Sequence, residues 1–321
     1  MGLKIIDNSY EKNELSQNAK GGTEMMLEAL YERVSPELLD KFQIIPSRVR
    51  ELKDKPRILW CHDLAEDPEV SKLADSEYRS QFAKLVFVSN WQFTTYNKVL
   101  GVPYDDSVVL RNAIVPFEKV NKSTEGPVRI IYHTTPHRGL NILHAAYEQL
   151  SKMYGDKIHL DVYSSFKIYG WEQRDAEYEG LFEALKDHPH ITYHGTKSNE
   201  EVREALSQAH IFAYPSIWQE TSCIAAIEAM SAGCRIVCPS YAALPETTAG
   251  LAWMYPWTSD LMKHANIFAN VLNDAIQEAF EYQKSGEASP TLLFQKMYAD
   301  GQYNWDHRAQ EWEAVLRALE I

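Results

Sequence analysis

One stretch of this chain, residues 211–246, restricts its fold more than any other: IFAYPSIWQETSCIAAIEAMSAGCRIVCPSYAALPE. A short apolar run leads into a polar loop that carries Glu220. An apolar helical segment at 224–232 then holds a single acid, Glu228, and a second apolar run follows at 235–238. This order of strand, loop, helix and strand predicts a βαβ unit.

The two acids of this stretch, Glu220 and Glu228, lie eight positions apart, and both are expected at the carboxyl edge of a parallel sheet. Open α/β sheets bind ligands at that edge, and a carboxylate in the early turns of a helix suits the helix dipole. Because its helical neighbours are apolar all round, Glu228 is expected to meet a ligand or partner. The alternative is a glutamate on the helix surface.

Strands and helices are predicted to alternate along most of the chain, which indicates Rossmann-like units. Strands are expected at 3–6, 44–45, 57–61, 85–88, 108–110, 129–132, 158–163, 191–194, 211–214 and 235–238. Helices are expected at 23–34, 91–100, 140–153, 178–186, 200–209, 224–232, 264–284, 290–298 and 305–319. A polar stretch with Pro and Gly at 115–127 is the predicted domain boundary.

Composition narrows the class of protein. With 321 residues, 45% hydrophobic and 24% charged, the chain is long enough for two globular domains. A net charge of −13 argues against a general nucleic-acid or anionic-membrane binder. No signal peptide or membrane-spanning apolar run is found, and the expected location is cytoplasmic. Four cysteines without framework spacing are expected as buried reduced thiols: Cys61, Cys223, Cys234 and Cys238.

Three further features are candidates for ligand contacts. Gly21-Gly22, between a strand and a helix, would let backbone amides approach an anion, or would simply make a turn. His62, just past a strand, would point to the crevice, or would pair with Asp63 at the surface. Arg138, in a loop before a helix, could offer two donors to a phosphate, or could be solvated. Together they suit a ligand with a diphosphate and several hydroxyls.

Histidine spacings raise the alternative of a metal site. The candidates are His133 with His137, and the group His188, His190 and His194. The first two are expected in a loop, and no cysteine or carboxylate joins either group in a recognised ligand pattern. No acidic pair stands at a strand end as a clear Mg²⁺ site. No metal is therefore expected.

Beyond these local patterns, the segment 215–246 resembles the nucleotide-sugar-binding signature of family 4 retaining glycosyltransferases (glycosyl transferases group 1), which have the GT-B fold. The signature is carried by Pro215-Ser216, Glu220, Glu228-Ala229-Met230, the run 232–237 and Pro245-Glu246. Further similarity covers most of the chain, through 88–91, 110–114, Asn304-Trp305, Gly21-Gly22 and His62.

The resemblance implies an α/β fold with two Rossmann-like domains facing across a cleft and a C-terminal helix returning to the N-domain. The expected divisions are 1–118 on the acceptor side, 119–302 for the nucleotide sugar and 303–321 for the closing helix, with 115–127 as a hinge. It also implies a metal-independent hexosyltransferase. Its partners would be a nucleotide-diphospho-sugar and a saccharide, small-molecule or protein acceptor, with no cofactor.

Carried over by position, the resemblance also implies roles for single residues. Glu228 would bind the ribose, Glu220 the transferred sugar, and Arg138 the diphosphate, while His62 would lie near the reacting centre. The implied catalytic residues are Glu220, Arg138 and His62. The implied donor-binding residues are Gly21, Gly22, His133, Arg138, Thr221, Ser222, Cys223, Ile224 and Glu228.

The chain departs from the family pattern at several positions, and the base, sugar and acceptor stay unassigned. Arg138 stands where the family has a lysine, and His133 stands near its first arginine. Tyr163-Ser164-Ser165 replaces a glycine-rich turn, and Thr221-Ser222-Cys223 replaces a Gly-Phe-Gly type. The N-domain is also short. The alternatives are a sugar-nucleotide epimerase on the same fold and a non-catalytic nucleotide-sugar-binding module.

Overall fold

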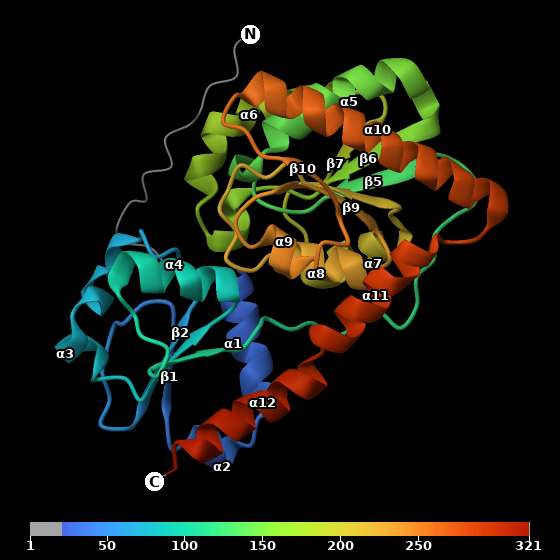
Figure 1. Cartoon of the computed structure of the whole chain (residues 1–321). Helices are drawn as coiled ribbons and strands as arrows, with labels where there is room; N and C mark the ends of the chain where they lie inside the picture. Colours follow the sequence, from blue (N-terminus) through green and yellow to red (C-terminus); the bar gives the residue numbers. More distant parts are fainter. Residues whose placement is uncertain (1–20, 321) are drawn as a thin grey trace. The chain divides into compact units, whose positions relative to one another are not determined.

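The computed structural model describes residues 21–320, which form two compact units. The N-terminal unit consists of 21–115, 219–224 and 301–320, and the C-terminal unit of 116–218 and 225–300. Each unit contains its own parallel sheet with helices on both faces (Figure 1). The strand expected at 3–6 lies outside the described residues.

The N-terminal unit is built on four parallel strands within the described range, in the order β1-β2-β3-β4. The strands are β1 Gln43–Pro46, β2 Arg57–Cys61, β3 Lys84–Phe87 and β4 Ser107–Val109. The helices are α1 Gly22–Arg33, α2 Pro36–Leu39, η1 Pro68–Ala74, α3 Ser76–Arg79, α4 Asn90–Leu100 and α12 Trp305–Ala318.

Side chains of β2 alternate between the two faces of this sheet, as the two-residue period of a strand requires. Ile58 and Trp60 join the core under α1 and α12, whereas Leu59 and Cys61 join the core under α4. The final helix α12 therefore packs in the N-terminal unit. A backbone bridge from Ile114 to the start of α12 fastens it there.

The C-terminal unit carries six parallel strands among the described residues, in the order β10-β9-β8-β5-β6-β7. They are β5 Val128–Tyr132, β6 Ile158–Val162, β7 Ile191–Tyr193, β8 Ile211–Ala213, β9 Arg235–Ser240 and β10 Trp253–Pro256. The α-helices are α5 Leu140–Tyr154, α6 Glu179–Asp187, α7 Asn199–Gln208, α8 Ile224–Ser231, α9 Leu244–Thr247, α10 Leu261–Ser285 and α11 Pro290–Gln302. Short 3-10 turns are η2 Pro136–Arg138, η3 Gly155–Lys157, η4 Phe166–Tyr169 and η5 Glu172–Tyr178.

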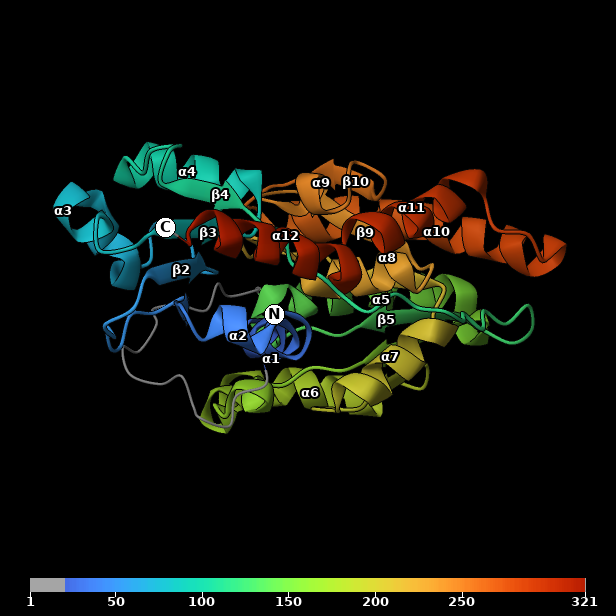
Figure 2. The same ribbon diagram turned by 90° about the horizontal axis from the view of Figure 1, so that it is seen from below.

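Strand order reverses between β5 and β8, because the chain builds outward from β5 to β7 and then from β8 to β10. Helices α5 and α10 cover one face of this sheet, and α7 and α8 cover the other (Figure 1). Figure 2 looks onto the face that α7 and α8 cover. The loops after β5 and β8 therefore leave the sheet at its switch point, where doubly wound sheets bind ligands.

The predicted alternation is confirmed, with shifts of a few residues at element ends. Ser198 caps α7 in a capping box with Glu201, and Ser89 caps α4, as their positions before these helices predict. The helices α2 and α9, residues 68–79 and β10 had no counterpart among the predicted elements, since short segments lack a clear period. All four cysteines are buried thiols. No helix in the described part of the chain is long and apolar enough to cross a membrane.

Candidate functional site

The loop after β5 holds polar atoms that are buried without a hydrogen-bond partner among the described residues. They are Nε2 of His133, Oγ1 of Thr134 and Nδ1 of His137. Buried polar groups in native proteins are nearly always hydrogen-bonded, so a cluster of exceptions needs an explanation. Its position at the switch point makes a bound ligand the explanation that fits best.

The two histidines of this loop pack against aromatic rings, and burial keeps both of them neutral. The ring of His133 lies 4.8 Å from that of Phe212, and burial lowers its pKa to about 4. The ring of His137 stacks on Phe166 at 5.1 Å and meets Trp218 edge-on at 5.0 Å. Burial, and then the neighbouring Arg138, lower the pKa of His137 well below its ordinary value. At neutral pH both rings therefore offer hydrogen bonds rather than charge.

Arg138 and Gly139 end the same loop at the start of α5. Nε of Arg138 donates to Oγ1 of Thr135 at 3.2 Å, and its guanidinium lies 5.6 Å from the ring centroid of Trp218. Gly139 has φ 113°, and a Cβ added there would stand 2.1 Å from the carbonyl oxygen of Pro215. Glycine is therefore required where the loops after β5 and β8 touch, and this contact holds Arg138 beside the second loop.

Glu228, the acid of α8, is buried with 5% of its surface exposed, so the alternative of a surface glutamate is wrong. Nη1 of Arg203 and Nδ2 of Asn199 donate to its Oε1 at 3.0 and 3.4 Å. Burial raises the pKa of Glu228, and the charge and hydrogen bond of Arg203 partly oppose the rise. The result is a buried acid held at one oxygen.

The loop before α8 belongs to the N-terminal unit in residues 219–224. There Oγ1 of Thr221 donates to the backbone oxygen of His62 at 3.0 Å. A Cβ on Gly22 would stand 2.9 Å from Cδ1 of Ile224, so the start of α1 lies against this loop. The structure thus brings Gly22, His62, Thr221 and Ile224 together in one unit.

The other predicted residues of this loop and of the α1 start are placed as follows. Glu220 and Cys223 are buried, with 6% and 3% exposed, and Ser222 is half-buried. Gly21 is the N-cap of α1 and provides no side-chain cap. Glu220 belongs to the N-terminal unit, whereas Glu228 belongs to the C-terminal unit.

His62 is a neutral ring beside an aromatic. Its ring lies 4.8 Å from that of Trp60, and its Nε2 is buried with no partner among the described residues. Burial lowers the pKa of His62 to about 3. Burial, with the charge of Asp67, raises the pKa of the adjacent Asp63 to about 6. The usual order of the two pKa values is therefore reversed, since the pKa of Asp63 is higher than that of His62.

Sequence reasoning missed the partners of the predicted residues. Asn199 and Arg203 both donate to Glu228. Their four-residue spacing places them on one face of a helix, but no local pattern links that face to Glu228. Arg174, whose guanidinium lies 4.4 Å over the ring of Phe166, helps to lower the pKa of His137. It lies in the irregular region after β6, where no periodic signal exists.

The histidines considered as metal ligands have other contacts. Nε2 of His194 lies 2.9 Å from Asp161, and its ring stacks on Tyr163 at 4.2 Å. Nε2 of His188 lies 3.2 Å from Oγ of Ser151. Among the residues that the structure describes, no group of three or more His, Cys, Asp or Glu side chains could hold a metal ion.

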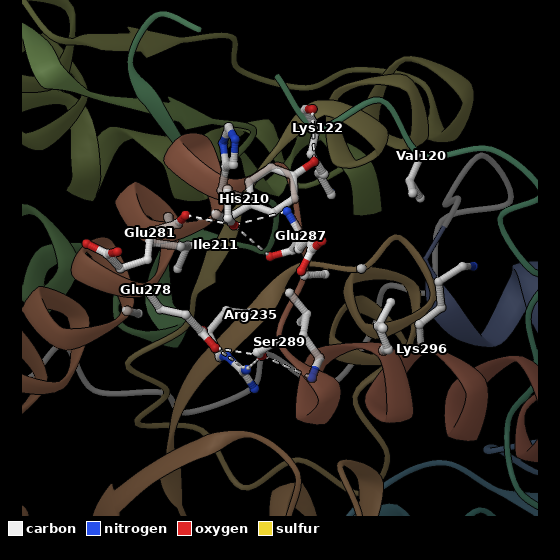
Figure 3. A pocket seen from close by; sticks show the side chains of 18 residues that line it. Val120, Lys122, His210, Ile211, Arg235, Glu278, Glu281, Glu287, Ser289 and Lys296 are labelled. Carbon is white, nitrogen blue, oxygen red and sulfur yellow. Dashed lines mark hydrogen bonds and ion pairs between the residues drawn. The ribbon is translucent and has the colours of Figure 1, made fainter. Parts of the chain in front are cut away.

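A cavity of about 220 Å³ lies at the opposite, amino edge of the C-terminal sheet (Figure 3). Its wall contains His210 and Arg235, at the starts of β8 and β9, and Glu278 and Tyr282 from α10. Arg235 and Glu278 bind each other and Ser289, as the dashed lines in Figure 3 show. Because these polar groups have partners within the protein, the carboxyl edge remains the candidate site.

Comparison with known proteins finds one matching family model, which covers part of the C-terminal unit. Residues 117–250 match the family model described as glycosyl transferases group 1, which confirms the resemblance over this segment. The segment includes the loops after β5 and β8 and the whole of α8. No curated protein sequence matches the chain.

Solved structures similar to this chain include three glycosyltransferases. A Rickettsia africae glycosyltransferase has 14% identity, with a TM-score of 0.65 over 96% of this chain and 84% of its own. Anabaena HepE, solved with UDP and glucose, has 12% identity, with a TM-score of 0.62 over 82% and 72%. The pneumococcal O-GlcNAc transferase GtfA, solved with UDP and GlcNAc, has 10% identity, with a TM-score of 0.60 over 83% and 53%. The chain thus spans about half of GtfA, and these likenesses show the GT-B fold.

Proposed function

We propose that this protein is a retaining glycosyltransferase that moves a sugar from a nucleotide-diphospho-sugar to a hydroxyl acceptor. The observation that carries the proposal is the loop after β5. There His133, Thr134 and His137 present buried polar atoms without partners among residues 21–320, directly before Arg138. The family match over 117–250, and neighbours solved with UDP and a sugar, support this reading.

Each side chain of the site has a part in this proposal. Arg138 binds the diphosphate, because a guanidinium offers parallel donors to phosphate oxygens. Glu228 accepts hydrogen bonds from the ribose hydroxyls, and Glu220 accepts them from the transferred sugar. Backbone amides of 221–224, at the start of α8, hold the phosphate and sugar.

The proposed reaction exchanges one C–O bond for another at the anomeric carbon. The bond to the β-phosphate oxygen breaks, and the acceptor oxygen bonds to the same carbon on the same face. The acceptor proton passes to the departing diphosphate, whose growing charge Arg138 stabilises. His62 contributes hydrogen bonds near the reacting centre, because its pKa of about 3 keeps it neutral at neutral pH. No metal takes part in this proposal.

The first test is a thermal-shift screen with UDP, GDP, ADP and their sugars. A ligand that binds the folded state raises the melting temperature, so the preferred base shows directly. We expect one nucleoside diphosphate to stabilise the protein, with or without EDTA. Absence of any stabilisation, or stabilisation only with a divalent cation, would contradict the proposal.

The second test measures turnover of the selected nucleotide sugar with saccharide, small-molecule and protein acceptors. We expect nucleotide release that depends on acceptor, and a product whose anomeric configuration by NMR equals that of the donor. Formation of an epimer without nucleotide release would identify an epimerase instead. Binding without turnover across the panel would identify a non-catalytic module.

A further inference from the structure

We infer that Arg203 is a positioning residue of the nucleotide site, which holds Glu228 by one carboxylate oxygen and leaves the other for the ribose hydroxyls. The inference rests on the proposed function, because it concerns how Glu228 meets a nucleotide. Arg203 lies on α7 and is not part of the motifs that indicated the site.

Two residues of α7 donate hydrogen bonds to the same oxygen of Glu228 on α8. Asn199 and Arg203, four residues apart and on one face of α7, both donate to Oε1 of Glu228, at 3.4 and 3.0 Å. Oε2 is outside this pair of hydrogen bonds. An ionised carboxylate can accept about four hydrogen bonds, so the second oxygen keeps capacity for two ribose hydroxyls.

Arg203 is itself held in place by the first residues of the C-terminal unit. Its guanidinium carbon lies 3.9 Å from the ring centroid of Phe117, which is buried. The Phe117 N–H donates to Oγ of Ser231 at 3.0 Å, and its carbonyl accepts from Nζ of Lys296 at 2.8 Å. Ser231 is on α8, the helix that carries Glu228. Phe117 therefore fixes the position of the Arg203 side chain relative to α8, the helix that carries Glu228.

The positive charge of Arg203 affects the pKa of Glu228, and this effect can be measured. Burial raises the pKa of Glu228, and Arg203 is the charged group that opposes the rise. Lys296 and Asp300 on α11 are charged, but they pair with each other and contact Ser231, the last residue of α8. Two further described groups that contact α8 carry no charge. Asn199 does not titrate, and His133, which contacts the backbone of Ala225, has a pKa of about 4. Removing the charge of Arg203 should therefore let Glu228 take up a proton at higher pH and lose acceptor capacity.

The test is calorimetric titration of the full chain at pH 6, 7 and 8, with UDP, GDP or ADP as the thermal-shift screen selects. The quantity compared is the ratio of wild-type to variant affinity at each pH, which cancels titration of the phosphate itself. For Arg203→Met we expect the ratio to grow as pH falls, by up to about tenfold per pH unit below the new pKa of Glu228. Arg203→Lys should restore a nearly constant ratio.

Two further variants separate positioning from folding. Arg203→Gln keeps a hydrogen-bond donor without the charge, and should show the same pH-dependent ratio if Arg203→Met fails to fold. Arg203→Met combined with Glu228→Gln should give a ratio that no longer depends on pH, because the titrating group is gone. Arg235→Met, which breaks the matched pair with Glu278, should leave the ratio near one at every pH.

A ratio for Arg203→Met and Arg203→Gln that stays constant across pH would overturn the inference and leave the proposed function standing. Absence of nucleotide binding by the wild-type chain would overturn the proposed function, and this inference with it. The two failures are therefore distinguishable.

Discussion

The C-terminal unit contains two glutamate–arginine pairs of similar construction, in each of which one member is buried and the other is half-buried. Glu228 pairs with Arg203, whose guanidinium lies over Phe117 at 3.9 Å, and Glu278 pairs with Arg235, whose guanidinium lies 5.1 Å from the Trp253 ring. The pairs differ in how much of the carboxylate is used. Arg235 reaches both oxygens of Glu278, at 2.6 and 2.7 Å, and Ser289 adds a bond of 2.8 Å. Arg203 and Asn199 reach only Oε1 of Glu228.

This difference decides the charge behaviour of each acid. Burial acts to raise the pKa of both groups, but at Glu278 the hydrogen bonds and charge of Arg235 outweigh it, and the pKa is lowered. At Glu228 burial prevails and the pKa stays raised. A fully bonded pair stabilises the fold, whereas a partly bonded acid at a switch point is a candidate for function.

The largest effect on stability is expected at the fully bonded pair. Glu278→Gln leaves Arg235, which is 2% exposed, without a carboxylate. We expect the free energy of unfolding to fall by about 3–5 kcal/mol, measured by urea denaturation, because a buried charge loses its partner. Nucleotide affinity should stay unchanged. A fall in the free energy of unfolding of less than about 1 kcal/mol would show that the Arg235–Glu278 pair does not stabilise the fold.

Arg138→Ala should have the largest effect on turnover. Without the guanidinium the departing diphosphate loses its charge partner, so we expect kcat at saturating donor to fall by about 10²–10³-fold. Arg129→Ala is the matched control, because Arg129 lies near the amino end of β5, the strand that precedes the Arg138 loop, and pairs with Asp161. Full turnover by Arg138→Ala would remove Arg138 from the proposed mechanism.

Gly139→Ala tests the contact between the two loops at the switch point. With φ 113° and Pro215 O 2.1 Å from the added Cβ, we expect at least about 1–3 kcal/mol of lost stability and weaker nucleotide binding. Gly250→Ala is the control, since Gly250 has φ 69° but open space around its Cβ position. Its stability loss should be smaller and its nucleotide affinity normal. Equal effects of the two substitutions would argue against the loop contact.

The smallest effect, and the sharpest contrast, lies in how stability varies with pH. Because the folded pKa of Glu228 is raised, its contribution is fully present below its unfolded pKa near 4.5 and is lost as pH rises. The stability of Glu228→Gln should therefore increase relative to that of the wild type as pH rises from 4 to 8. The lowered pKa of Glu278 gives the opposite sign, since its contribution is lost as pH falls. Urea unfolding across this range should give slopes of opposite sign, and equal signs would contradict the comparison.

Features set by residues close together in the sequence could be predicted, whereas contacts between residues far apart in the sequence could not. The βαβ order and the isolated acid Glu228 are local patterns, and the structure confirms the βαβ order and excludes a surface position for Glu228. Arg203 was missed because it meets Glu228, 25 positions later, only through the packing of α7 on α8. The requirement for glycine at 139 likewise comes from the distant backbone of Pro215. The roles of Glu220, His62 and the loop 221–224 stay predictions until a ligand is tested.

The most direct test of the central claim is calorimetric titration of the screened nucleoside diphosphate into wild type, Glu228→Gln and Glu278→Gln at pH 7.5. If the carboxyl edge of the C-terminal sheet is the nucleotide site, Glu228→Gln should bind about tenfold more weakly, equivalent to about 1.4 kcal/mol. Glu278→Gln should bind as the wild type does. Equal affinity of wild type and Glu228→Gln, or loss of binding in Glu278→Gln alone, would contradict the claim.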